Sequence, residues 1–313
     1  MANILITSEY FAAFSQEGKQ VLEQAGHRVI DNPYGHTFLT PDKILPHVHE
    51  ADALVCDLEH ITKEVIDAAP HLKIISRRGV GVDSVDVAYA NSKGIAVART
   101  LGVVEPPVAE LVMAYILEFS RNVSKLNCDM HNGKWEKLEC HSVNGKTLGI
   151  VGMGKIAFEV ARRAHAFGMK LLYCDQQANQ QAERQFGAVQ AENLDQLLSQ
   201  ADFVTLHLPL TEQTKGMFHY ETIAKMKPTA YLINTARGAI VDQEDLYRAV
   251  QEGAIAGAAI DVFDKEPMED SCLAALPQVL LTPHVGTFTQ EIFIQMDIVA
   301  AQNIVAFFEK EGS

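Results

Sequence analysis

The sequence predicts an α/β protein built from two doubly wound parallel-sheet domains, and three observations carry this prediction. Short β-type runs alternate with helical patterns along almost the whole chain, which is typical of parallel strands with helices on both faces of the sheet. The length of 313 residues is sufficient for two domains, each with its own core. A glycine-rich turn near the middle of the chain follows a strand and opens a helix, as in dinucleotide-binding units.

The first third of the chain supplies one set of strands. They are predicted over residues 3–7, 27–31, 52–56, 73–76 and 95–98. A helical pattern lies between the first two and stops at Gly26, because glycine readily adopts the left-handed conformation that ends helices. A long helix opens at Pro106 and Pro107 and runs on through LVMAYILEFSRNV. It is apolar over most of its circumference, which predicts burial in a core or against a partner subunit.

The second half of the chain repeats the alternation. Further strands are predicted over residues 203–208, 230–235, 256–261 and 278–282. Each ends beside a polar or charged residue, namely His207, Arg237, Asp261 and His284. Ligands of open parallel sheets bind outside the carboxyl ends of the strands, so these residues are candidates for a site. The C-terminal segment 292–310 reads as one amphipathic helix, which we expect to return to the first domain to bury its apolar face.

The segment TLGIVGMGKIAFEVA has the features that a dinucleotide requires. Gly152 permits a tight turn, Gly154 lets the backbone approach a pyrophosphate, and the helix from Lys155 offers unpaired N–H groups to it. Asp175 follows the first glycine by about 20 residues, the spacing of the carboxylate that binds the adenosine ribose. Its charge would repel a 2′-phosphate, which favours NAD over NADP. The alternative is an ordinary turn between a strand and a helix.

The composition limits the classes of partner. The net charge of −14 argues against nucleic acid and anionic membranes, and no apolar run in the sequence approaches the length of a membrane span. The N-terminus lacks the pattern of a signal peptide. The five cysteines are scattered and odd in number, which favours reduced thiols and a cytoplasmic protein. No metal site is expected, because the adjacent Cys140 and His141 lack ligand spacing.

Three residues at separate strand ends form a complete set for hydride transfer at a carbon beside a carboxylate. Arg237 can pair with the substrate carboxylate and polarise the neighbouring carbonyl. His284 can exchange the hydroxyl proton, and Glu266 can fix the tautomer of its ring. Taken singly, each has an ordinary explanation as a surface charge, a loop cap or a solvated turn. Their joint occurrence after a nucleotide motif favours catalysis.

The whole chain resembles the D-isomer-specific 2-hydroxyacid dehydrogenases, through RRGVGVDSVD, PPVAELVMAYIL, NGKTLGIVGMGKIA, HLPLTEQTKGMF, LINTARGAIVD, AAIDVFDKEP and LTPHVGTFT. The resemblance implies a Rossmann-type NAD-binding domain (100–287) inserted into a flavodoxin-like substrate domain (1–99 and 288–313). It assigns catalysis to Arg237, Glu266 and His284. It also implies a homodimer through the helix near 106–125.

The resemblance further implies the contacts of each ligand. The cofactor contacts fall on Gly152, Gly154, Lys155, Ile156, Asp175, Thr235, Asp261 and Gly286, with Asp261 placed to hold the nicotinamide carboxamide. The substrate contacts fall on Arg77, Arg78, Val80 and Gly81. The two arginines suit a phosphate or a second carboxylate, the alternative being surface ion pairs. Within the family the chain looks most like 3-phosphoglycerate dehydrogenases, which favours 3-phosphoglycerate as substrate and a role in serine biosynthesis.

Two other functions stay open. Departures from the family pattern at LGVVEPPVAE, Asp83-Ser84 and Thr287-Phe288 leave room for a reductase of hydroxypyruvate, glyoxylate or another small 2-oxoacid. An NADH-sensing, corepressor-like binding protein would share the fold and the three catalytic residues. No regulatory ligand-binding domain is expected, since only five residues follow Phe308.

Overall fold

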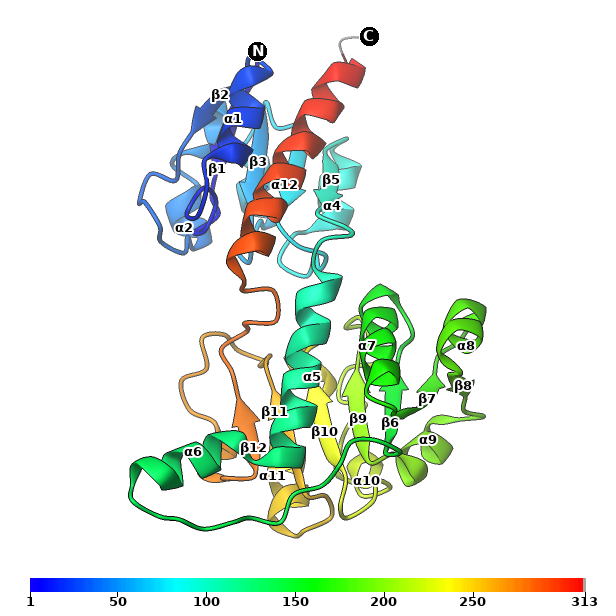
Figure 1. Cartoon of the computed structure of the whole chain (residues 1–313). Coiled ribbons are helices and arrows are strands. Elements are labelled where there is room, and N and C mark those ends of the chain that lie inside the picture. Colours follow the sequence, from blue (N-terminus) through cyan, green and yellow to red (C-terminus); the bar gives the residue numbers. More distant parts are fainter. Residues whose placement is uncertain (312–313) are drawn as a thin grey trace. The chain divides into compact units, whose positions relative to one another are not determined.

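The computed structural model describes residues 1–311, and the chain divides into two compact units (Figure 1). Unit 1 consists of Met1–Val104 and Thr287–Ser313, and unit 2 of Glu105–Gly286. The boundaries predicted after residues 99 and 287 lie close to these two divisions. The chain therefore leaves unit 1, forms unit 2 and returns.

Within the described residues, unit 1 contains a five-stranded parallel sheet in the order β2-β1-β3-β4-β5. The strands are β1 (Asn3–Ile6), β2 (Arg28–Ile30), β3 (Ala53–Cys56), β4 (Ile74–Arg77) and β5 (Ala96–Arg99). The helices are α1 (Glu17–Gln24), α2 (Pro41–Ile44), α3 (Lys63–Asp67), α4 (Val87–Ser92) and α12 (Gln290–Glu311), with a short 3₁₀ turn at Val48–Glu50. This strand order is the flavodoxin-like one, which confirms the predicted fold of this unit.

Alternate residues of the unit 1 strands face opposite layers, as the pleat of a strand requires. In β1, Ile4 packs into the core formed with α1 and α12, whereas Leu5 packs into the core formed with α2, α3 and α4. Both side chains are almost completely buried. Burial on both faces explains why the strands read as continuous apolar runs.

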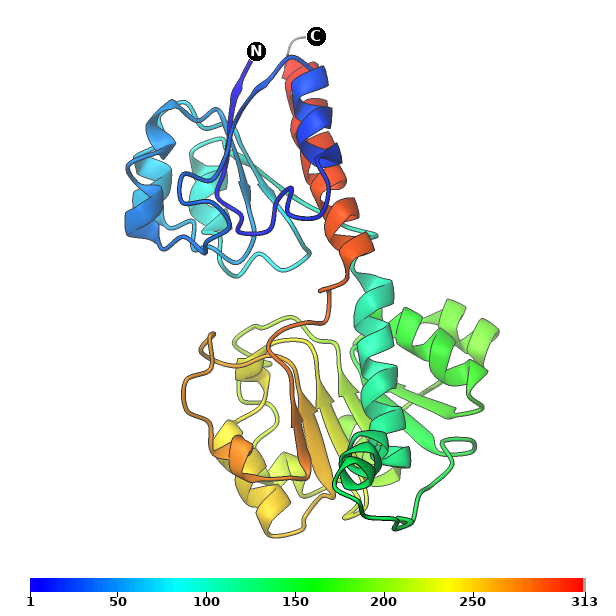
Figure 2. The ribbon, with the colours of Figure 1, turned by 60° about the vertical axis from the view of Figure 1, so that its left-hand side comes forward.

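The C-terminal helix α12 lies along α1 and against the unit 1 sheet (Figure 2). Ala300, Ala301 and Ile304 on this helix are fully buried in the core. Among the described residues, α12 is the one helix long and apolar enough to cross a membrane by length and composition. The expectation that no apolar run approaches the length of a membrane span was therefore wrong for this segment. Part of its apolar surface packs in the unit 1 core, as expected for a helix that returns to the first sheet.

Within residues 1–311, unit 2 contains a seven-stranded parallel sheet in the order β12-β11-β10-β9-β6-β7-β8. The strands are β6 (Thr147–Val151), β7 (Lys170–Cys174), β8 (Val189–Gln190), β9 (Phe203–Leu206), β10 (Tyr231–Asn234), β11 (Gly257–Ile260) and β12 (Val279–Leu281). The chain winds outward from β6 in one direction to β8 and in the other from β9 to β12. The point of reversal, between β6 and β9, is where doubly wound sheets of the Rossmann type bind their ligands.

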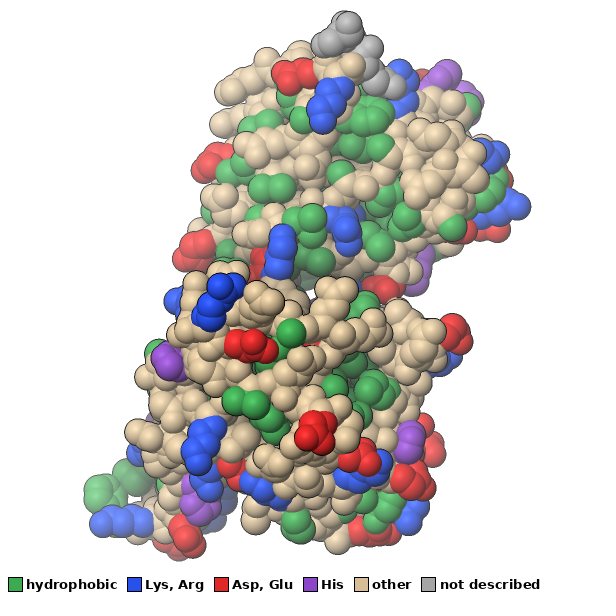
Figure 3. All heavy atoms as spheres, turned by 90° about the vertical axis from the view of Figure 1, so that its right-hand side faces the viewer, with side chains coloured by type: hydrophobic (Ala, Val, Ile, Leu, Met, Phe, Trp, Pro, Cys, Tyr) green, Lys and Arg blue, Asp and Glu red, His purple; other side chains and the backbone are tan. Residues whose placement is uncertain are grey.

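Helices cover both faces of the unit 2 sheet. One core cluster is shared by α5 (Glu105–Arg121), α7 (Lys155–Ala166) and α8 (Gln180–Phe186). The other is shared by α9 (Leu194–Gln200), α10 (Tyr220–Ile223) and α11 (Gln243–Gln251). Short 3₁₀ turns cover Gly238–Ile240 and Cys272–Ala275. On the face shown in Figure 3, acidic and basic side chains are interspersed over the surface of both units.

The long apolar helix α5 is shorter than its pattern predicts. It ends at Arg121, because Asn122 takes a left-handed conformation with φ of 50° and separates it from α6 (Val123–His131). The side chains of Val112 and Ile116 are fully buried in the core that α5 shares with α7. The apolar character of α5 is therefore explained by burial within its own unit.

Candidate functional site

The glycine turn after β6 lies at the reversal point of the unit 2 sheet. Gly152 has φ of +88°, and a Cβ atom there would lie 2.6 Å from the carbonyl oxygen of His207, which follows β9. Both the conformation and the close approach therefore require glycine. Burial lowers the pKa of His207 to about 3, so this imidazole is neutral at physiological pH. Its Nε2 atom lies 3.0 Å from the hydroxyl of Thr205.

A cleft of about 600 Å³ opens beside this turn. It is lined by Met153, Gly154, Asp175, Gln176, Gln177, Ala178, Asn179 and Gln180. Asp175 follows β7, and its carboxylate accepts a hydrogen bond of 2.6 Å from the backbone N–H of Met153. A Cβ atom on Gly154, which caps α7, would meet no described atom within 4 Å. The turn is therefore open on the side from which a ligand pyrophosphate would approach the protein backbone.

These features fit NAD. The start of α7 presents backbone N–H groups suited to a pyrophosphate, with Lys155 exposed and Ile156 half-buried beside them. The carboxylate of Asp175 lines the adjoining cleft, where a ribose hydroxyl would lie. Further along the strand ends, the Thr235 hydroxyl oxygen after β10 is buried with no hydrogen-bond partner among residues 1–311. A buried polar atom of this kind is commonly satisfied by a ligand.

Asp261, after β11, organises the loop that carries His284. It is 1% exposed and accepts hydrogen bonds from the Thr282 hydroxyl (2.5 Å) and from the backbone N–H groups of Val285 (2.8 Å) and Gly286 (2.9 Å). Burial raises the pKa of Asp261, and these hydrogen bonds oppose the rise. The carboxylate therefore holds the loop in one conformation. Contact with a carboxamide stays a prediction for this residue.

His284 and Glu266 form a close pair within unit 2. Nδ1 of His284 lies 2.6 Å from Oε2 of Glu266, and Oε1 of Glu266 accepts a hydrogen bond of 2.9 Å from the backbone of Phe263. Burial alone would raise the pKa of Glu266. The hydrogen bond and charge of His284, together with the charge of Arg237, outweigh burial and hold that pKa below its usual value. The carboxylate therefore accepts a hydrogen bond from Nδ1–H of His284, which leaves Nε2 to exchange a proton with a ligand.

Arg237 lies on a closely packed turn after β10. Its carbonyl oxygen accepts a hydrogen bond of 2.9 Å from the Asn234 side chain, and its guanidinium donates one of 2.6 Å to the carbonyl of Ala236. The next residue, Gly238, lies directly against the backbone of Phe263, where a Cβ atom would overlap. Glycine at this position thus lets the Arg237 turn pack against the segment that leads to Glu266.

The predicted substrate contacts lie in unit 1, at and after the end of β4. Val80 and Gly81 are half-buried, and the Arg77 residue is 9% exposed. The Arg78 side chain is fully buried and forms ion pairs with Asp57 and Asp297. The positive charge that the sequence places here is therefore compensated inside the unit, rather than at the surface.

Several residues around these sites could not be identified from the sequence pattern. Asp297 lies on α12, more than 200 residues from Arg78 along the chain, and carries no local signal of pairing. Gln176 to Gln180, which line the cleft in unit 2, form a polar run directly after Asp175. Their position after a strand of the nucleotide motif was the available signal. Phe288, a bulky departure from the family pattern, packs edge-on against Tyr10 and against Phe293.

Comparison with known proteins agrees with this arrangement. Residues 113–286 match the family model for the NAD-binding domain of D-isomer-specific 2-hydroxyacid dehydrogenases. The chain is 42% identical over 273 residues to a glyoxylate reductase of Korarchaeum cryptofilum, covering 84% of this chain and 82% of the relative. It is 36% identical over 307 residues to a D-3-phosphoglycerate dehydrogenase of Methanocaldococcus jannaschii, covering 97% of this chain and 57% of the relative.

A solved structure extends the comparison to the fold. The D-lactate dehydrogenase of Aquifex aeolicus, crystallised with NAD and lactic acid, superposes with a TM-score of 0.85 at 27% identity, covering 98% of this chain and 96% of that one. The predicted fold and NAD as cofactor are confirmed. The protein is an NAD-dependent oxidoreductase acting on CH–OH groups, and the chain belongs to the D-isomer-specific 2-hydroxyacid dehydrogenase family.

Proposed function

We propose that this protein reduces a small, unphosphorylated 2-oxoacid of the glyoxylate and hydroxypyruvate class with NADH. The observation that carries the choice of substrate is the burial of Arg78 between Asp57 and Asp297. A guanidinium already paired with two carboxylates has little charge left to attract a substrate phosphate. The identity to a glyoxylate reductase supports the same choice, whereas the identity to a phosphoglycerate dehydrogenase supports the alternative.

Different residues of unit 2 have different roles in the reaction. Bound NADH supplies the hydride, and we assign its binding to Gly152, Gly154, Lys155, Ile156, Asp175, Thr235 and Gly286. Arg237 pairs with the substrate carboxylate and withdraws electron density from the adjacent carbonyl. His284 donates the proton from Nε2 to the carbonyl oxygen, and Glu266 stabilises the charged ring through Nδ1. In alcohol oxidation the same ring accepts the proton instead.

A substrate panel tests this proposal. NADH oxidation is measured with purified protein against glyoxylate, hydroxypyruvate, pyruvate, oxaloacetate and 3-phosphohydroxypyruvate. We expect kcat/KM for the best unphosphorylated acid to exceed that for the phosphorylated one by about tenfold or more. The reverse order would favour phosphoglycerate oxidation and a role in serine biosynthesis. NADH binding without turnover of any acid would instead favour an NADH-sensing binding protein.

We also propose a homodimer, and we place its interface on α6 and the segment that follows it, because most of the helix predicted near 106–125 is α5, which is buried within unit 2. Val123 and Met130 on α6 are 60% and 50% exposed, and Trp135 is 82% exposed. Large apolar side chains exposed to this extent are typical of an interaction surface. Replacing Trp135 with serine is expected to increase the monomer fraction at low concentration, measured by sedimentation velocity. Phe167→Ser is the matched control, because Phe167 is an exposed residue directly after α7. An unchanged association in Trp135→Ser would contradict this interface.

Replacing Glu266 with glutamine is expected to move the pH profile of reduction. Reduction requires a protonated His284, so activity falls as pH rises. The hydrogen bond and charge of His284 lower the pKa of Glu266, so the carboxylate and the charged ring stabilise each other. Glutamine removes this attraction, so the fall occurs at lower pH, by about one pH unit. Oxidation, which requires the neutral ring, should become active at correspondingly lower pH.

The measurement is kcat/KM for reduction between pH 5 and 9. Glu269→Gln provides the control, because Glu269 is exposed and forms a surface ion pair with Lys265. A profile that coincides in wild type and Glu266→Gln would show that the carboxylate does not assist the protonated ring.

Replacing Asp175 with alanine is expected to weaken the preference for NADH over NADPH by about tenfold. The carboxylate is the charged acceptor in the cleft beside the glycine turn, and it would repel a 2′-phosphate there. Asp175→Asn separates charge from geometry, because an amide oxygen can still accept the Met153 N–H. The ratio of kcat/KM for the two cofactors is the measurement. If both variants discriminate as the wild type does, another residue sets the preference.

A further inference from the structure

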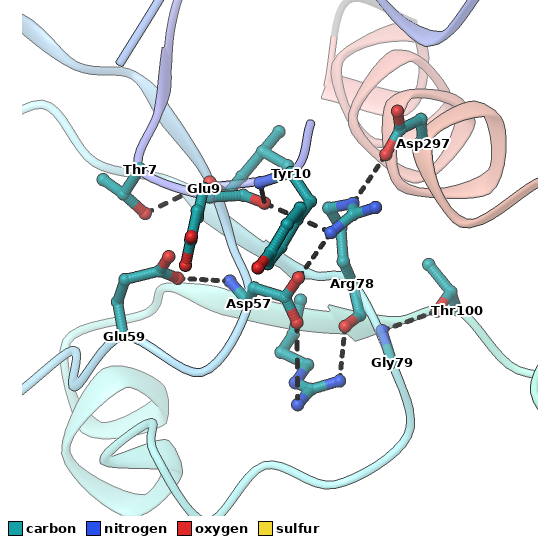
Figure 4. A network of polar contacts seen from close by, with 12 residues as sticks. Thr7, Glu9, Tyr10, Asp57, Glu59, Arg78, Gly79, Thr100 and Asp297 are labelled. Carbon is teal, nitrogen blue, oxygen red and sulfur yellow. Dashed lines mark hydrogen bonds and ion pairs between the residues drawn. The ribbon is translucent and has the colours of Figure 1, made fainter. Parts of the chain in front are cut away.

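We propose that Asp57 is a specificity-determining residue, whose carboxylate neutralises the arginines at the end of β4 and excludes substrates with a second strongly anionic group. This inference rests on the proposed function, because it explains why an unphosphorylated acid would be preferred. The position of Asp57 is the starting observation. It follows β3 directly, at the same edge of the unit 1 sheet where β4 ends at Arg77. Figure 4 shows Asp57 beside Arg78, the residue that follows this strand.

Arg78 is held on several sides by unit 1 itself. Its Nε atom donates a hydrogen bond of 2.6 Å to Asp297, one of its terminal nitrogens pairs with Asp57, and the same nitrogen lies 3.2 Å from the Ser8 hydroxyl. The guanidinium carbon lies 4.9 Å from the centre of the Phe293 ring. The side chain is closed to solvent. Arg78 is thus a structural cation. A ligand would be attracted only by the part of its positive charge that Asp57 and Asp297 do not neutralise.

Arg77 is the more accessible of the two arginines and shares the same carboxylate. Its side chain is 11% exposed, and its terminal nitrogen lies 4.0 Å from the second oxygen of Asp57. The other terminal nitrogen donates to the carbonyl of Arg78. Nε of Arg77 and one terminal nitrogen of Arg78 are buried with no hydrogen-bond partner within residues 1–311. The pair therefore retains donors, while Asp57 supplies the charge that opposes an incoming anion.

Asp57 is itself held in place. Oε2 of Glu59 accepts a hydrogen bond of 2.5 Å from the backbone N–H of Asp57 (Figure 4). Glu59 is fully buried, and burial together with the charge of Asp57 raises the pKa of Glu59 to about 7. A second carboxyl group close to Asp57 further disfavours a ligand anion at this edge, and more so as pH rises.

With Glu59 protonated, the formal charges at this edge cancel. Arg77 and Arg78 carry two positive charges, and Asp57 and Asp297 carry two negative ones, all on side chains that are largely or completely buried. A dianionic phosphate would meet no net attraction here and would lie near a fixed carboxylate. A hydroxymethyl group or a hydrogen atom carries no such penalty. Removing the charge of Asp57 alone would leave one uncompensated positive charge, shared between the two guanidinium groups.

The test is Asp57→Asn, which retains the size of the side chain and an oxygen acceptor for Arg78. We expect the ratio of kcat/KM for 3-phosphohydroxypyruvate to that for hydroxypyruvate to rise by about tenfold. Inorganic phosphate should also inhibit hydroxypyruvate reduction at lower concentration, and should raise the Tm of the variant more than that of the wild type. Asp31→Asn is the matched control, because Asp31 is an exposed carboxylate of the same unit that pairs with Lys19.

The outcomes separate this inference from the proposed function. An unchanged substrate ratio in a variant that still reduces hydroxypyruvate would overturn the role of Asp57 and leave the proposed function standing. A wild type that prefers the phosphorylated acid, with a further rise of that preference in Asp57→Asn, would support Asp57 and refute the proposed substrate class. Asp57→Ser, which leaves a small hydroxyl acceptor beside Arg78, replaces Asp57→Asn if the latter does not fold. If neither variant folds, strong competitive inhibition of the wild type by millimolar phosphate would overturn the inference.

Discussion

Replacing His284 with alanine is expected to lower kcat for 2-oxoacid reduction by roughly three to four orders of magnitude. The imidazole is the proposed proton donor at the carbonyl oxygen, and no hydride can be accepted at that carbon without charge accumulating on the oxygen. NADH binding should remain close to that of the wild type. Backbone contacts set the position of the loop, since the His284 N–H donates a hydrogen bond of 2.9 Å to the carbonyl of Asp261. The alanine variant keeps this hydrogen bond.

The backbone conformation of His284 requires a second variant. Its φ is +52°, in the left-handed region, where alanine is disfavoured and asparagine is tolerated. His284→Asn therefore removes the titratable ring with less strain on the loop. NADH affinity by fluorescence titration and kcat by absorbance at 340 nm separate the two effects. Reduction at the wild-type rate in His284→Asn would remove the ring from the chemistry, whereas lost NADH binding in both variants would indicate a structural role.

Much of the fold follows from local pattern. Strands buried on both faces appear as short apolar runs, and glycine marks the turn after β6 because both a positive φ and the approach of His207 exclude a side chain. The pairing of Glu266 with His284 could be expected, because both follow neighbouring strands whose carboxyl ends lie at one edge. Short local segments set the position of each of these residues, and the parallel sheet brings the segments together.

The remaining features depend on contacts that sequence separation conceals. A single residue, Asn122 in a left-handed conformation, ends α5 before the apolar pattern ends. The compensation of Arg78 involves one carboxylate from the loop after β3 and another from α12, and neither lies near it in the sequence. Two adjacent arginines at the end of a strand therefore suggest a site for a ligand anion. In the folded unit, the carboxylates of Asp57 and Asp297 neutralise this positive charge instead. Electrostatics of this kind can be judged only after the topology is known.

Replacing Arg237 with alanine is expected to lower kcat/KM for 2-oxoacid reduction by roughly a thousandfold, which corresponds to about 4 kcal/mol. The guanidinium is proposed to make two charge-assisted hydrogen bonds to the substrate carboxylate, each worth about 1.5–3 kcal/mol. It also stabilises the negative charge that develops on the carbonyl oxygen, so both KM and kcat should be affected. Its turn after β10 is fixed by the Asn234 side chain and by Gly238, so the loss should not reflect a collapsed loop.

Arg237→Lys separates charge from geometry, because an ammonium keeps the positive charge and loses the planar, two-pronged contact. We expect it to recover part of the activity lost in Arg237→Ala, with the remaining defect mainly in KM. Added guanidinium ion should raise the activity of the alanine variant and leave that of the lysine variant unchanged, because only the former has room for it. Circular dichroism and Tm confirm that each variant is folded. Near-normal kcat/KM in folded Arg237→Ala would show that another cation binds the carboxylate, and Arg77 of unit 1 would then be the next residue to test.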